Sequence, residues 1–79
     1  MITYKNPYTQ KIYAILIPLI GDFMARGVIK NQVTKLGLTE DNIAKKDLSA
    51  LAEGIKKGLI AFIGSEKANQ VASKIVAIL

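Results

Sequence analysis

Apolar residues recur at helical spacing along almost the whole chain, and this periodicity limits the fold more than any other feature. In the first half these positions are Tyr8, Ile12, Leu16, Leu19, Phe23 and Val28. In the second half they are Leu48, Leu51, Ala52, Ile55, Leu59, Phe62 and Ile63, then Ala68, Val71, Ala72, Ile75, Ile78 and Leu79. Residues three and four positions apart share one face of a helix, whereas no segment alternates as a half-buried strand does. The sequence therefore predicts an all-α fold.

Capping residues predict where the first helix begins and ends. Asn6 is a good N-cap, and Pro7 suits the first helical turn, where a missing N–H costs nothing. Gly37 is a plausible C-terminal cap because it adopts a left-handed backbone cheaply. The helix between them is about 30 residues, or about 45 Å if straight. Pro18 is expected to kink or split it, because proline removes a backbone hydrogen bond and crowds the preceding turn.

Further caps predict shorter helices in the second half. Thr39, followed by two acidic residues, predicts a short helix to about Lys46. Asp47 can cap a new helix there, or one continuous helix can run through it. Gly64 is expected to end that helix and Ser65 to cap the last. The resulting expectation is a small bundle of four to five helices with a long, Pro-kinked first helix.

Length and composition limit the chemistry. We recognise no linker, low-complexity stretch or internal repeat, so we expect a single helical domain over residues 1–79. The chain has no Cys and no His, which excludes disulfides, zinc-thiolate sites, thiol nucleophiles and imidazole bases. No two carboxylates have an obvious reactive spacing, and a chain this short has little room for a pocket of about 300 Å³ or more. We expect no catalytic residue, cofactor, metal or enzymatic activity.

The chain is basic, with 11 Lys+Arg against 6 Asp+Glu and a net charge of +5. Such a charge either attracts nucleic acid or anionic lipid, or keeps the surface solvated. We favour the solvated surface, because Arg26 is the single arginine and bidentate recognition of phosphate favours arginine. For the alternative, a nucleic-acid-binding protein, the contacts would be the lysine doublets Lys45, Lys46, Lys56 and Lys57.

A second alternative is a basic helical bundle that binds a membrane surface. The apolar run from Ile12 to Ile20 has nine residues, whereas a transmembrane helix needs about 20. We therefore expect no transmembrane segment. The lack of cysteine is consistent with a cytoplasmic location.

A ridge of small residues is the main candidate for an interaction surface. It consists of Ala50, Gly54, Gly58 and Ala61, spaced as on one side of a helix. Each of its two glycines lowers the stability of the helix by up to about 1 kcal/mol relative to alanine. Close packing must therefore offset this loss. The ridge either packs within the chain or mediates self-association, and both interpretations stay open. The mean hydropathy of +0.29 favours a homo-oligomer, with a dimer preferred, or binding to another helical protein. The complete predicted surface is Ala50, Gly54, Gly58, Ala61, Ile60, Ile75 and Leu79.

Overall fold

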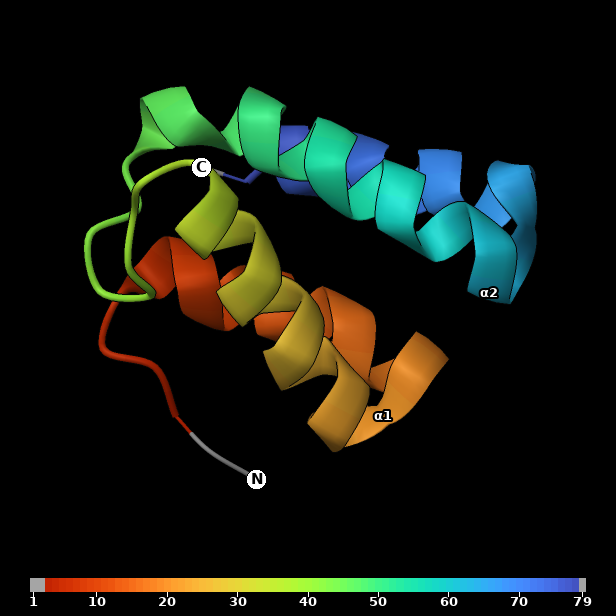
Figure 1. Cartoon of the computed structure of the whole chain (residues 1–79), viewed down its shortest axis with the longest axis horizontal. Coiled ribbons are helices and arrows are strands. Elements are labelled where there is room, and N and C mark those ends of the chain that lie inside the picture. The colour runs from red at the N-terminus through yellow and green to blue at the C-terminus, as the bar shows by residue number, and fades with distance from the viewer. Residues whose placement is uncertain (1–2, 79) are drawn as a thin grey trace.

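The computed structural model describes residues 3–78, which form two long helices joined by a loop (Figure 1). Helix α1 spans Pro7–Lys35, a short 3-10 helix η1 spans Lys45–Asp47, and helix α2 spans Leu48–Val76. The described residues contain no strand, which confirms the all-α prediction. The predicted bundle of four to five helices is wrong, because this part of the chain has only two α-helices.

A glycine interrupts each long helix. Gly21 has φ 80° and ψ 169°, and Gly64 has φ 85° and ψ 161°, a backbone region used almost only by glycine. A straight helix of 29 residues would be about 44 Å long, whereas the longest axis of the molecule is 29 Å. Each helix therefore folds back on itself (Figure 1). We call its two halves arms: 7–20 and 22–35 in α1, 48–63 and 65–76 in α2.

The break in α1 lies at Gly21 and not at Pro18, where the kink was expected. Pro18 stays inside the helix, because its ring fixes φ near −65°, which is a helical value. A φ near +80° is costly for any residue with a Cβ atom, so the reversal falls at the next glycine. The break in α2 needs no proline at all, since residues 48–76 contain none. Glycine therefore sets the position of both reversals.

The caps of α1 are confirmed. The Asn6 side-chain oxygen accepts hydrogen bonds from the N–H groups of Tyr8 (2.9 Å) and Thr9 (3.2 Å). Beyond the last turn, Gly37 has φ 72°, and its N–H bonds to the Thr34 carbonyl at 3.1 Å. These contacts satisfy backbone groups that a helix end leaves unpaired.

The predicted short helix from Thr39 to about Lys46 is wrong. The Thr39 N–H donates to the Asn42 side-chain oxygen at 2.8 Å, which closes a turn of the kind that asparagine favours. A one-turn 3-10 helix, η1, follows it. Asp47 precedes α2 as expected, but its carboxylate accepts the Ala44 N–H at 2.9 Å instead of capping α2.

Side chains at the start of α1 hold the loop in place. The Asn6 amide donates to the Ile43 carbonyl at 2.8 Å, and the buried Thr9 hydroxyl donates to the Glu40 carbonyl at 2.6 Å. Both bonds join residues more than 30 positions apart. They fix the entry to α2 relative to α1.

One apolar core lies between α1 and α2. In α2 the predicted stripe is buried from Leu48 to Leu59, whereas Phe62 at its end is 64% exposed. In α1 the buried apolar side chains come from both arms, before and after the break at Gly21. The core residues are Ile12, Tyr13, Leu16, Ala25, Ile29, Val33, Ile43, Leu48, Leu51, Ala52, Ile55, Leu59, Ala68, Val71, Ile75 and Ile78.

Candidate functional site

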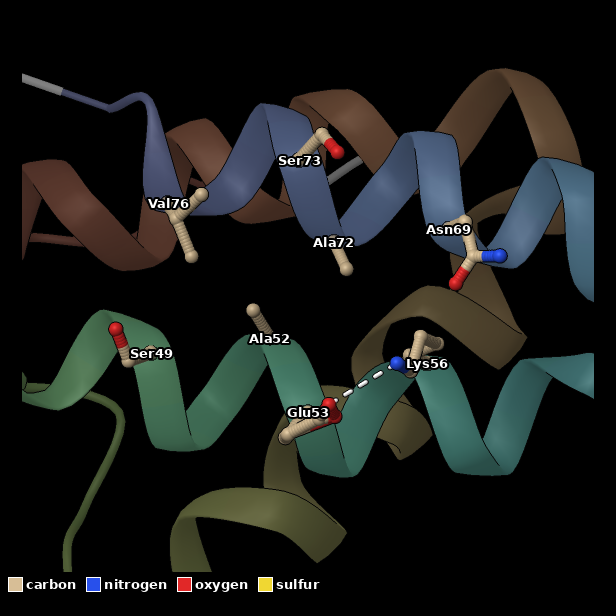
Figure 2. Close-up of a pocket in the computed structure, with 8 residues that line it drawn as sticks. All are labelled: Ser49, Ala52, Glu53, Lys56, Asn69, Ala72, Ser73 and Val76. Carbon is tan, nitrogen blue, oxygen red and sulfur yellow. Dashed lines mark ion pairs between the residues drawn. The ribbon is translucent and has the colours of Figure 1, made fainter.

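An open groove runs between the two arms of α2 (Figure 2). Its volume is about 470 Å³, within the range of about 300–1,000 Å³ that is usual for ligand pockets. One wall comes from residues 48–63 and the other from residues 65–76. The lining residues are Ser49, Ala52, Glu53, Lys56, Asn69, Ala72, Ser73 and Val76.

The groove combines an apolar floor with polar groups along its walls. Ala52 and Ala72 project toward each other from the facing arms (Figure 2). Glu53 and Lys56 form an ion pair of 3.0 Å on the first arm, and Asn69 lies on the opposite arm. Such a surface suits an amphipathic group that has an apolar body and a polar end.

The two helices are repeats of one pattern, with matching residues 43 positions apart. The segment 16–25 reads LIPLIGDFMA and the segment 59–68 reads LIAFIGSEKA, which are identical at five of ten positions. The burial pattern follows the same offset, since Ile12 and Leu16 of α1 and Ile55 and Leu59 of α2 are all buried. The expectation of no internal repeat is therefore corrected.

In α1 the counterpart of the groove is covered by Tyr4 and by the loop, whose Glu40 and Ile43 carbonyls accept hydrogen bonds from Thr9 and Asn6. The Tyr4 N–H donates to the Gln10 side-chain oxygen at 2.7 Å, and its ring lies edge-on to Tyr13 at 5.3 Å between centroids. On the second arm, Tyr4 lines a cavity together with Arg26 and Lys30. Burial, and after it the charge of Glu40, raises the pKa of Tyr4. We call this arrangement the Tyr4 seat.

A polar network joins the two arms of α1 behind this seat. The buried Tyr13 hydroxyl donates to the carboxylate of Asp22, and Arg26 pairs with the same carboxylate at 3.2 Å. The Tyr13 hydrogen bond, and to a smaller extent the Arg26 charge, lowers the pKa of Asp22. The network fixes the arms relative to each other.

A second candidate surface surrounds the two breaks. The described residues include seven exposed large apolar side chains, and five of them lie within four positions of Gly21 or Gly64. Phe23 is 83% exposed and Phe62 is 64% exposed. Figure 1 places both breaks at the same end of the molecule. We call this the elbow surface, and it comprises Leu19, Phe23, Met24, Ile60 and Phe62.

The predicted small-residue ridge is divided by the structure. Ala50, Gly58, Ala61 and Ile60 are exposed, and nothing lies within 4 Å of a Cβ built on Gly58. At Gly54, by contrast, such a Cβ would lie 2.1 Å from the Gln32 side-chain oxygen. Gly54 therefore serves a close contact with α1 inside the chain.

Of the two remaining residues of the predicted surface, one is buried and the other is not described by the structure. Ile75 is fully buried in the core, so its side chain offers no surface on the single chain. Leu79 lies outside the described residues. The exposed apolar area near the ridge is consequently the end occupied by Ile60 and Ala61.

The two predicted lysine doublets do not form one patch. Lys45 and Lys46 lie in η1 at the loop, whereas Lys57 lies nine residues into α2, or about 14 Å along its axis. Lys56 faces the groove and is paired with Glu53.

Two further features bear on metal binding and on membrane insertion. Within residues 3–78, no group of three or more His, Cys, Asp or Glu side chains lies close enough to hold a metal ion. By length and composition alone α1 could cross a membrane, a property that buried core helices share. In this structure it reverses at Gly21.

Compared with protein-family models, curated proteins and solved structures, the chain shows no significant match.

The sequence analysis missed the groove, the Tyr4 seat and the exposure of Phe23 and Phe62. A visible signal was the shared pattern LIxxIGxxxA, which places a glycine reversal at the same point of each helix. Once both reversals are known, each helix must bring its own arms side by side.

Proposed function

We propose that this protein is a non-enzymatic helical interaction module that forms a homodimer through its elbow surface. The observation that carries the proposal is the concentration of exposed apolar side chains around the two breaks, led by Phe23 and Phe62. Large apolar groups that gather on one part of a small protein are typical of an interaction site.

The charges near the elbow surface favour a second copy over an anionic partner. Within four positions of either break glycine, the charged residues are Asp22, Glu66 and Lys67. This end therefore lacks the positive excess of a chain whose net charge is +5. A surface for nucleic acid or anionic lipid would carry its lysines beside the contact. Two copies of a basic chain, by contrast, meet most easily where neither is strongly positive.

The test is the mass in solution, measured by light scattering after gel filtration over a tenfold dilution. At the higher concentration, we expect the wild-type mass to be twice that of the 8.6 kDa chain. Phe62→Ser is expected to shift the protein to the monomer, because it removes an aromatic contact from the interface.

The matched control is Leu36→Ser, which removes an exposed apolar side chain from the end of α1, away from both breaks. This variant is expected to remain a dimer. A wild-type monomer at every concentration, or equal dissociation of the two variants, would overturn the proposal.

A further inference from the structure

We infer that the groove between the arms of α2 is a binding site for an aromatic residue, preferably tyrosine, in an extended segment of a partner protein. This inference goes beyond the proposed self-association and does not depend on it. The groove lies toward the ends of α2, whereas the elbow surface surrounds the breaks.

Because the two helices are repeats, the chain already contains one filled example of this site in α1. In the Tyr4 seat, the segment before α1 places an aromatic ring against Tyr13 on the first arm of the helix. Tyr4 contacts Gln10 and Tyr13 on the first arm and lines a cavity together with Arg26 and Lys30 of the second. The residues 43 positions further on are Glu53, Lys56, Asn69 and Ser73, and all four line the groove of α2.

The described part of the chain does not fill this second site. The position that corresponds to Tyr4 is Asp47, and its carboxylate turns back to the Ala44 N–H. The chain before α2 comes from the loop, which Asn6 and Thr9 hold against α1. The described residues before α2 therefore place no side chain in this groove as residues 3–6 place Tyr4 against α1. Figure 2 shows the facing side chains with open space between them.

The residues that differ between the two repeats still suit recognition of an aromatic residue. Gln10 accepts the Tyr4 N–H, and its counterpart Glu53 offers a carboxylate, which accepts more strongly. Tyr13 presents its ring to Tyr4, and its counterpart Lys56 offers an ammonium group that can lie over an aromatic face.

The remaining walls of the groove suit the ring and its hydroxyl. The Ala52 and Ala72 methyl groups form an apolar floor, whereas Asn69 and Ser73 can bond a phenol oxygen. Val76, which is 51% exposed at the end of the groove, would lose apolar surface to the bound ring. Tyrosine has both an apolar ring and a polar end, so it matches this lining better than phenylalanine.

The experiment uses the full-length ¹⁵N-labelled protein and the capped peptide Thr-Tyr-Lys-Asn, which copies residues 3–6. Titration followed by NMR is expected to shift the amide signals of Ser49, Glu53, Asn69 and Ser73 in a saturable manner. A matched peptide with alanine in place of tyrosine is expected to bind about tenfold more weakly or worse, because it lacks the aromatic ring.

Two protein variants make the test specific. Ala72→Leu is expected to abolish binding by filling the groove, whereas Ala14→Leu, on an exposed turn of α1, leaves it unchanged. If circular dichroism shows that Ala72→Leu does not fold, Ser73→Leu replaces it, because Ser73 is exposed on the same wall. Phe62→Ser is expected to bind the peptide as tightly as wild type, which separates this inference from the proposed dimer.

The inference is overturned if the groove amides do not shift. It is equally overturned if the alanine peptide binds as well as the tyrosine peptide. Shifts confined to the Tyr4 seat or to the elbow surface would also contradict it.

Discussion

Gly64 holds a backbone conformation that only glycine adopts without strain, with φ 85° and ψ 161°. Gly64→Ala is therefore expected to lower the free energy of unfolding by about 1–3 kcal/mol, measured by urea denaturation. Gly27→Ala is the matched control, since Gly27 is helical and a Cβ there meets nothing within 4 Å. That control should stabilise the protein by up to about 1 kcal/mol. Changes of the same sign in both variants would contradict this account of the breaks.

Asp22 makes the stability of the folded protein decrease as the pH falls into the acid range. The hydrogen bond from Tyr13 and the charge of Arg26 lower its pKa in the folded state. The stabilisation is complete above the unfolded pKa of about 3.9 and is lost as the pH falls through the lower folded value. Urea denaturation at neutral pH and near pH 3 should therefore show a smaller acid loss in Asp22→Asn than in wild type. Asp41→Asn, in the exposed loop, is the control that should retain the wild-type acid loss.

At the scale of the helices, the repeat predicts that matching core positions contribute similarly to stability. Ile12 in α1 and Ile55 in α2 are both buried and lie 43 residues apart. Ile12→Val and Ile55→Val are each expected to cost about 0.5–1.5 kcal/mol, because each removes one buried methylene. Ile60→Val, at an exposed position, should stay within about 0.5 kcal/mol of wild type. A large difference between the first two variants would mean that the repeats are not energetically equivalent.

The ends of the helices could be predicted where a side chain or a glycine acts locally. Asn6 and Gly37 mark the two ends of α1 as expected, because a cap depends on residues within one turn. Thr39 failed as a helix start, since its turn is closed by Asn42 and the loop is fixed by bonds from Asn6 to a distant carbonyl. Such long-range contacts leave no local signal in the sequence.

The candidate site was harder to predict because it depends on which segments become neighbours. Ala52 and Ala72 lie 20 positions apart and face each other only because α2 reverses at Gly64. Gly54 illustrates the same limit, since its close contact is with Gln32 of the other helix. Helical periodicity places each of these residues on a face but does not say what covers that face.

At the scale of the molecule, six of the ten lysines lie ten or more positions from either break. Figure 1 shows the two breaks at one end and the loop between α1 and α2 at the other. Five of these lysines lie just before α1, in η1 and in the last turns of both helices, and each is far along the chain from either break. These residues are Lys5, Lys35, Lys45, Lys46 and Lys74. In the proposed dimer, the elbow surfaces of two copies would meet while these five lysines point apart.

A dimer that forms in this way links stability to protein concentration. If folding and association are coupled, each tenfold increase in concentration stabilises the folded dimer by about 1.4 kcal/mol, or about 0.7 kcal/mol per chain. A domain of this size should then gain several degrees in Tm for each tenfold step. Phe62→Ser should show a Tm that does not change with concentration, whereas Leu36→Ser should keep the wild-type slope. Thermal unfolding followed by circular dichroism over two tenfold steps measures this slope. A wild-type Tm that is independent of concentration, in a protein that light scattering finds dimeric, would mean that the dimer dissociates into folded chains below the Tm and that folding and association are not coupled.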